Sequence, residues 1–216
     1  MKKKFLFSAG IIILLLVVDQ IVKIWVKSSF HYSDPSVPLI GEWFRLNYVE
    51  NQGMAFGTTL GGGMWGKLLL SIFRIVAIAF IGYYIFKRIR SGASKEFVVI
   101  ASLVFAGALG NLLDSMFYDF LFEFDPCVPF NHLDGSGIVA TCEIFGYVDE
   151  IEVRHQGFLF GNVVDMFQFY VSWPSWVPWL GGSQVFPAVW NVADAAISVG
   201  VIYVLFRQKH FFPKEG

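Results

Sequence analysis

Long apolar runs recur along the 216-residue chain, separated by polar or irregular stretches. Four of these runs carry few charges and have the length that a membrane-spanning helix needs, which is about 20 mostly apolar residues. They cover residues 5–26, 68–86, 97–117 and 188–206. The pattern therefore predicts an α-helical integral membrane protein with four transmembrane helices.

The composition supports a membrane protein and argues against a soluble one. Hydrophobic residues make up 56% of the chain and charged residues 15%, whereas soluble domains carry about 25% charged residues. The mean hydropathy is +0.59. The net charge of −1 combines basic helix ends with an acidic stretch, and nothing in it indicates nucleic-acid binding.

The first apolar run follows Met1-Lys-Lys-Lys4 and is similar to the start of a secretory signal peptide. No small-x-small cleavage site follows it, and apolar residues continue through Ile21, Ile24 and Trp25. We therefore expect an uncleaved transmembrane helix.

Basic residues predict the orientation of the helices. They lie before the first span, between the second and third, and after the fourth, at Lys2, Lys3, Lys4, Lys87, Arg88, Arg90, Lys95, Arg207, Lys209 and Lys214. Because Lys and Arg collect on the cytoplasmic side, both termini are expected to be cytoplasmic. Between Asp119 and Arg154 there are eight acidic residues and one basic residue, which agrees with a stretch on the outer face.

Two cysteines, Cys127 and Cys142, fall in this acidic stretch. An oxidising compartment permits a disulfide between them, and two free thiols are the alternative. A zinc site with His132 and His155 is a further alternative, but the spacing contains no C-x-x-C or H-x-x-x-H pair.

The two outer connections carry aromatic residues in different patterns. The first contains Glu42-Trp-Phe-Arg-Leu-Asn-Tyr-Val49, whose aromatic and branched residues predict a strand at the membrane surface. The second ends in residues 158–170 and Trp173, Trp176 and Trp179. Tryptophan is enriched at the water–lipid boundary, so this second stretch is expected to lie in the interface.

The pattern Asn-x-x-Asp occurs three times, as Asn111-Leu-Leu-Asp114, Asn162-Val-Val-Asp165 and Asn191-Val-Ala-Asp194. A charged side chain near hydrocarbon is costly, so these carboxylates indicate a functional site. All three are expected near the outer face. A helix cap at Asp194 and a solvated loop carboxylate at Asp165 are the structural alternatives.

A second pair of charges lies in the first span, where Asp19 and Lys23 are four residues apart. This spacing allows an ion pair on one helix face. We interpret the pair as a means of lowering the cost of burying both charges.

Two carboxyl groups in a poorly solvated site cannot both ionise at low cost, so one keeps its proton. Such a pair can divide acid and base roles around a water molecule and hydrolyse an amide without a metal or another cofactor. The alternative is a small proton-coupled transporter or channel, but transport sites lie near the bilayer midplane, often between repeated halves. No halves repeat in this chain. A non-enzymatic scaffold leaves the three carboxylates unexplained.

Five stretches resemble, in order, the motifs of the lipoprotein signal peptidases, also called signal peptidase II. They are Val18-Asp-Gln-Ile-Val-Lys23, Asn51-Gln-Gly-Met-Ala-Phe-Gly57, Gly107-Ala-Leu-Gly-Asn-Leu-Leu-Asp114, Val163-Val-Asp-Met-Phe167 and Phe186-Pro-Ala-Val-Trp-Asn-Val-Ala-Asp-Ala-Ala-Ile197. Each motif alone is weak, but five in this order, spread over nearly the whole chain, are highly specific.

The resemblance implies an aspartic endopeptidase embedded in the membrane. It removes the signal peptide of a bacterial prolipoprotein on the N-terminal side of the cysteine that carries diacylglycerol. The catalytic pair maps to Asp165 and Asp194. Substrate-binding and site-shaping positions map to Asn51, Gly53, Asn111, Asp114 and Asn191, and supporting positions to Asp19 and Lys23.

The resemblance also implies an architecture and a set of partners. The expected fold is a single membrane domain of four transmembrane helices with a small extracytoplasmic β-cradle and a short surface helix. The expected place is the bacterial inner membrane, with the active site at the outer face. The expected partners are the diacylglyceryl-prolipoprotein substrate and membrane lipids, without nucleic acid, for a monomer that holds no metal or cofactor.

Two departures from the family pattern stand out. Ser115 occupies the position after the third-helix Asn-x-x-Asp motif, where an arginine is common. Arg154 is a candidate to replace that arginine.

The second departure is the length of residues 115–164. They form an extracytoplasmic insertion, far longer than the usual link, which we interpret as a lid or an accessory surface. Asn162 completes the middle Asn-x-x-Asp but matches no family position.

Overall fold

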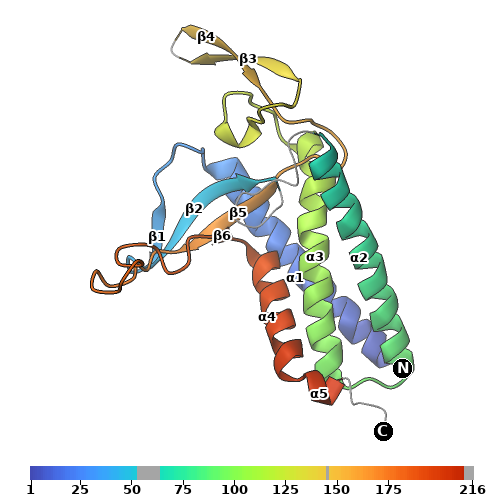
Figure 1. Cartoon of the computed structure of the whole chain (residues 1–216). Coiled ribbons are helices and arrows are strands. Elements are labelled where there is room, and N and C mark those ends of the chain that lie inside the picture. The colour runs from blue at the N-terminus through green and yellow to red at the C-terminus, as the bar shows by residue number, and fades with distance from the viewer. Residues whose placement is uncertain (53–63, 145, 212–216) are drawn as a thin grey trace. The chain divides into compact units, whose positions relative to one another are not determined.

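The computed structural model describes residues 1–52, 64–144 and 146–211 (Figure 1). The helices are α1 (Lys2–Ser29), α2 (Met64–Arg90), α3 (Lys95–Leu121), η2 (Pro129–Asn131), α4 (Val192–Phe206) and α5 (Gln208–Phe211). The strands are β1 (Val37–Ile40), β2 (Phe44–Asn51), β3 (Val139–Ile144), β4 (Tyr147–Glu152), β5 (Val163–Phe169) and β6 (Val189–Trp190). The protein is mainly helical, with a small β region.

Three of the described helices are long and apolar enough to cross a membrane: α1, residues Trp65–Arg90 of α2, and α3. They contain the first three predicted spans. The fourth predicted span, 188–206, corresponds to α4, an apolar helix of 15 residues. This helix begins later than predicted because the chain at Val189–Trp190 pairs as a strand. These helices and the composition make the chain a helical membrane protein.

The described chain divides into two compact units. Unit 1 holds α1 up to Val22, α2 from Leu69, α3 up to Leu113, and helices α4 and α5. Unit 2 holds every described strand, η2 and the remaining ends of α1, α2 and α3.

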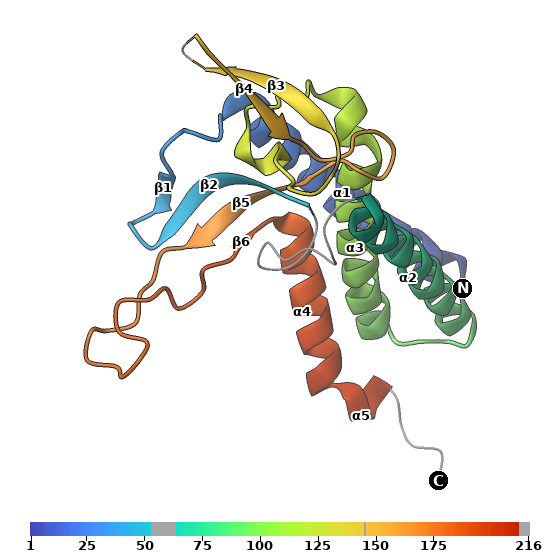
Figure 2. The same ribbon diagram turned by 45° about the horizontal axis from the view of Figure 1, so that its top comes forward.

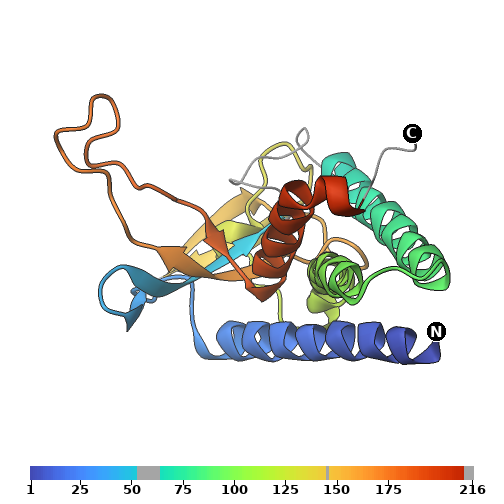
Figure 3. The same ribbon diagram turned by 90° about the horizontal axis from the view of Figure 1, so that it is seen from below.

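In unit 1, α3 is the central helix (Figure 3). Half of the most apolar stretch of α3 is buried, compared with 11% of the corresponding stretch in α1 and 17% in α2. Ser8 of α1 and Ser102 of α3 share a hydrogen bond of 2.7 Å between their hydroxyl groups. Hydroxyl pairs of this kind join helices where water is absent.

Two glycines allow α3 and α4 to pack closely within unit 1. A Cβ on Gly107 would overlap the backbone carbonyl of Ala193, and a Cβ on Gly200 would overlap the side chain of Val104. Small residues let helix backbones approach each other in this way. The contact brings the first turn of α4 against α3.

In unit 2, four strands form an antiparallel sheet in the order β1-β2-β5-β6 (Figure 2). Val49 of β2 lies opposite Asp165 of β5, and Asn51 lies opposite Val163. The register shifts between Leu46 and Val49, so β2 contains a bulge beside Asp165. Bulges often occur next to functional sites, where they redirect a side chain.

The strand predicted at residues 42–49 is confirmed by β2. No strand was predicted at β5, where a stretch lying in the membrane interface was expected. The first four residues of β5 are all buried, so buried and exposed positions do not alternate there as they do in a strand with one solvated face. The strand forms because it pairs with β2 on one side and β6 on the other.

Aromatic rings cover part of this sheet. Phe44 stacks on Phe167 with centroids 5.6 Å apart, and Trp190 lies 5.1 Å from Phe167. Aromatic pairs at such distances add stability beyond their buried area. The cluster ties β2, β5 and β6 together at the end of the sheet away from Asn51.

The insertion at 115–164 contains η2 and the antiparallel hairpin of β3 and β4. A disulfide joins Cys127 to Cys142 on β3. The disulfide hypothesis is therefore confirmed, and the alternatives of two free thiols and of a zinc site with these cysteines are wrong, because neither cysteine is free.

We expect the disulfide to stabilise the insertion. The two cysteines are 15 residues apart, and closing a loop of that size is worth about 3 kcal/mol in the chain-entropy model. Replacing both with Ser should lower the melting temperature, whereas Thr141→Ser on the same strand should not. Mass spectrometry after alkylation should find no adduct on the native protein and two after reduction. An adduct without reductant would contradict the disulfide.

Candidate active site

Asp165 lies on β5 in unit 2 and is 2% exposed. Its two carboxylate oxygens accept from different asparagines. Asn191 Nδ2 donates to Oδ1 at 2.7 Å, and Asn51 Nδ2 donates to Oδ2 at 3.2 Å. The structure therefore brings three predicted site residues together. Two amide donors hold the carboxylate plane of Asp165 in one orientation.

Asn191 is fully buried and lies between β6 and α4. Its Nδ2 also donates to the carbonyl of Val164, at 3.2 Å. The amide is thus bound to both the backbone and the side chain of neighbouring residues on β5. This arrangement anchors the chain at the point where it leaves the sheet and enters α4.

Asp194 lies in the first turn of α4 in unit 1. Asn111 Nδ2 on α3 donates to its Oδ1 at 2.7 Å. The N-terminal end of a helix favours a negative charge because backbone N–H groups there point outward. Asn111 and Asp194 are brought together as predicted site residues. The pairing of Asp194 with Asp165 of unit 2 stays a prediction.

Asp19 of α1 is fully buried and contacts the first turn of α4. Its Oδ1 accepts a hydrogen bond of 2.9 Å from the backbone N–H of Ala193. That N–H is one of the helix-terminal donors that have no partner within their own helix. Asp19 therefore caps α4 from another helix and orients the turn that carries Asp194.

Lys23 and Asp114 form an ion pair in unit 2. Lys23 Nζ lies 2.7 Å from Asp114 Oδ2, and both side chains have zero exposure. The same oxygen accepts from the backbone N–H of Val164, the residue before Asp165, at 3.4 Å. Asp114 thus connects α1 and α3 to the strand that carries Asp165. The predicted pairing of Lys23 with Asp19 stays a prediction.

Gly161 brings the start of β5 against the end of α3. Its N–H donates to the carbonyl of Ser115 at 3.0 Å, and a Cβ would overlap the carbonyl of Asp114. A side chain at position 161 would push β5 away. Ser115 itself is fully buried. Gly53, the remaining predicted site residue, lies outside the described residues.

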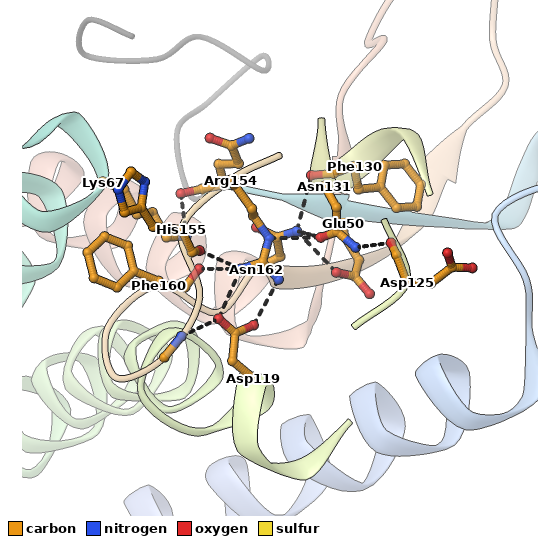
Figure 4. A network of polar contacts seen from close by, with 12 residues as sticks. Glu50, Lys67, Asp119, Asp125, Phe130, Asn131, Arg154, His155, Phe160 and Asn162 are labelled. Atoms are coloured by element: carbon orange, nitrogen blue, oxygen red, sulfur yellow. Dashed lines mark hydrogen bonds and ion pairs between the residues drawn. The ribbon is translucent and has the colours of Figure 1, made fainter. Parts of the chain in front are cut away.

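Arg154, the candidate replacement for the missing arginine, is 6% exposed and bound inside the insertion (Figure 4). It forms a bidentate ion pair with Asp119, at 2.8 and 2.9 Å. Its Nε donates to Asn131 at 2.8 Å. These contacts hold the guanidinium in place and argue against a contact between Arg154 and a substrate.

Two residues beside the site were not predicted from the sequence to belong to it. Glu50 precedes Asn51, and Asn162 precedes β5. Asn162 Nδ2 donates to Glu50 Oε2 at 3.2 Å. Asn162 is 2% exposed, so it is a bonded, buried residue. The signal for it was the middle Asn-x-x-Asp pattern, whose Asn162 matches no family position and was therefore left out of the predicted site.

Long apolar helices define this protein as a helical membrane protein, and the carboxylates of Asp165 and Asp194, held by asparagine amides, give it a polar site. The profile of signal peptidase (SPase) II matches residues 11–209. The chain belongs to the signal peptidase II family, and it is therefore a protease. The family membership leaves the transporter alternative without support.

Named relatives agree with this membership, and a solved structure shares the fold. The lipoprotein signal peptidase of Porphyromonas gingivalis strain W83 is 39% identical over 203 residues, which cover 91% of this chain and 80% of the relative. That of Amoebophilus asiaticus is 32% identical over 218 residues, covering 97% and 80%. A bacterial membrane enzyme solved at 1.9 Å shares the fold with a TM-score of 0.56 at 19% identity, covering 97% of this chain and 94% of that chain.

Proposed function

We propose that this protein removes signal peptides from bacterial prolipoproteins, cutting before the cysteine that carries diacylglycerol. Its relatives are named lipoprotein signal peptidases. The observation that carries the proposal is the buried Asp165 carboxylate, which two asparagine amides hold from both sides. A buried carboxylate oriented by fixed donors suits acid–base chemistry on an amide bond.

In the proposed mechanism, Asp165 and Asp194 share a water molecule. One carboxylate takes a proton from the water as it attacks the scissile carbonyl. The other is protonated and donates a hydrogen bond to the carbonyl oxygen, where negative charge develops. The two groups titrate as a pair, and one of them keeps a proton because two charges in a poorly solvated site repel each other.

Chain connectivity supports this pairing. Asn191 donates to Asp165 and precedes Asp194 by three residues in the sequence. Asn111 and Asp19 hold the turn of α4 that carries Asp194. In this proposal the asparagines orient both carboxylates, and Asn51, Asn111, Asn191 and Gly53 also border the bound substrate.

Asp114 has a supporting role in the proposal. Its pairing with Lys23 and its contact with Val164 leave it directed at the protein. We therefore assign Asp114 to holding β5, together with Asp19 and Lys23, which act on neighbouring elements. This assignment replaces a direct contact between Asp114 and substrate.

We also propose how the protein lies in the bacterial inner membrane. The four apolar helices span the bilayer as a single membrane domain, both termini are cytoplasmic, and the site lies at the outer face. The small sheet forms an extracytoplasmic cradle, accompanied by a short surface helix. Trp176 and Trp179 are 80% and 101% exposed, which suits side chains at the lipid boundary. The protein acts on lipid-borne substrate as a monomer, without a metal or a cofactor.

Cleavage of a lipidated substrate tests the proposed function. Purified protein in detergent should release the signal peptide from a synthetic prolipoprotein peptide whose cysteine carries diacylglycerol. The same peptide with an unmodified cysteine should be cut far more slowly, because it lacks the lipid chains that provide binding energy and position the scissile bond. Gel electrophoresis and mass spectrometry identify the products. Equal cleavage of both peptides would contradict the substrate class, and no cleavage of either would contradict the activity.

A further inference from the structure

The strands β2 and β5 carry polar contacts on both faces of the sheet. Successive side chains of a strand point to opposite faces of the sheet. Asn51 and Asp165 contact each other on one face. Glu50 comes one position before Asn51, and Asn162 comes three positions before Asp165. These odd spacings place Glu50 and Asn162 on the opposite face, where they contact each other. A second polar cluster therefore lies behind the strands that carry the proposed catalytic carboxylate.

Glu50 is the centre of this second cluster. Its carboxylate forms an ion pair with Lys27 at the end of α1 and accepts a hydrogen bond from Tyr48. Its side chain is only 6% exposed. Burial raises the pKa of the Tyr48 phenol, and the neighbouring charge of Glu50 raises it further, so Tyr48 stays a donor. The buried Glu50 carboxylate is held by a cation, a phenol and an amide.

Asn162 connects Glu50 to the insertion. Besides Glu50, its Nδ2 contacts the carbonyl of Phe130 and Oδ1 of Asn131, both at 3.3 Å. Phe130 and Asn131 belong to η2. The rings of Phe130 and Tyr48 also form a T-shaped pair, with centroids 5.9 Å apart. The short helix of the insertion thus packs directly behind β2.

The insertion in turn is anchored to α3 through Asn131 and Arg154 (Figure 4). Arg154 donates to Asn131 Oδ1 at 2.8 Å and pairs with Asp119 on α3. Asp119 also accepts from the N–H of Gly157 at 3.0 Å. Both partners of the ion pair are nearly buried, at 7% and 6% exposure. A connected series of polar contacts runs from Asp119 through Arg154, Asn131 and Asn162 to Glu50.

We propose that Glu50 and Asn162 are positioning residues for Asp165, and that through them the insertion holds β2 and β5 in the register that the Asn51–Asp165 hydrogen bond requires. This inference rests on the proposed function, because it assigns Asp165 to catalysis. The bulge in β2 explains why the register needs such support. A bulged strand pairs less regularly, so contacts beside the bulge stabilise its register.

The proposal explains why the insertion carries a buried cation. Arg154 and Asp119 lie far along the contact series from Asp165, yet they fix the position of Asn131, and Asn131 fixes Asn162. Asn162 is therefore part of the site support, and the insertion is more than a loop added to the surface.

Kinetics of Asn162→Ala and Glu50→Gln test the proposal. Misplacement of a catalytic group by about 1 Å costs as much as 10²-fold in rate, so we expect kcat to fall by about 10- to 10²-fold with little change in KM. Asp149→Asn, an exposed carboxylate on β4 of the same insertion, is the matched control and should leave kcat unchanged.

A double-mutant cycle separates positioning from general loss of stability. In an Asn51→Ala background, Asn162→Ala should have almost no further effect on kcat. The first change removes the Asn51–Asp165 hydrogen bond, and the second acts only by misplacing that same bond. Additive effects, or an unchanged kcat in the single variant, would overturn the proposal.

Hydrogen exchange gives a readout that does not depend on cleavage. Asn162→Ala and Arg154→Lys should each speed exchange of the backbone amides of β2 and β5, while Asp149→Asn should not. If the wild type fails to cleave but exchange follows this pattern, the proposed function fails and the positioning contact remains. Unchanged exchange in both variants would overturn the contact itself.

Discussion

Asp165→Asn and Asp194→Asn are each expected to reduce cleavage of the lipidated peptide by about 10³-fold or more, since each change removes one member of an acid–base pair. Asn has nearly the shape of Asp, but its amide cannot act as a general acid or base near neutral pH. The double variant should be little worse than either single variant, because members of one catalytic unit are not additive. Single-turnover cleavage in detergent, followed by mass spectrometry, measures the rates.

The matched control for these variants is Glu42→Gln, which neutralises a carboxylate that is 85% exposed in the same unit as Asp165. It should leave the rate unchanged. The melting temperature of Asp194→Asn should stay near that of the wild type, because its remaining side-chain oxygen can still accept from Asn111. Asp165→Asn should lower the melting temperature modestly, because its new amide donor faces the amide donor of Asn51 or Asn191. If either Asp variant keeps more than about a tenth of the wild-type rate, the pair is assigned to the wrong residues.

Lys23→Met is expected to give the largest loss of stability. It leaves the Asp114 carboxylate buried without its cation, and breaking a buried ion pair in this way costs about 3–5 kcal/mol. For a chain of this size that loss corresponds to a drop in melting temperature of about 6–20 °C. Thermal unfolding in detergent, followed by intrinsic fluorescence, measures the shift.

A paired replacement tests the physical reason for that loss. Lys23→Met combined with Asp114→Leu removes both charges, so it should recover much of the stability that the single variant loses. Glu42→Gln, which breaks an exposed pair with Arg45, should shift the melting temperature little. A single Lys23→Met variant as stable as the wild type would contradict a stabilising role for the buried pair.

The helices were predictable because their signal is local. Each predicted span lies within or overlaps a helix, since runs of apolar residues that favour helix need no distant partner to be recognised. The strand β2 also has a local signal in its aromatic and branched residues. The strand β5 does not, because its buried faces depend on pairing with β2, which lies more than a hundred residues earlier in the chain.

The candidate site divides in the same way. Asp165, Asp194, Asn51, Asn111 and Asn191 were found from motifs, because acidic and amide residues in apolar surroundings are unusual enough to be noticed. The contacts of Arg154 could not be predicted. Its partner Asp119 is 35 residues away, and eight acidic residues in the stretch were equally plausible partners.

Composition and motifs were sufficient to identify a helical membrane protein, its family, and the residues that the family motifs mark. These follow from composition and from short patterns that are complete within a few positions. The folded chain was needed to show that Cys127 and Cys142 are joined, that Asp114 pairs with Lys23, and that Asn162 contacts Glu50 beside the strand of Asp165. Such contacts depend on how distant segments approach, because a hydrogen bond or an ion pair forms only where folding brings its two groups within reach.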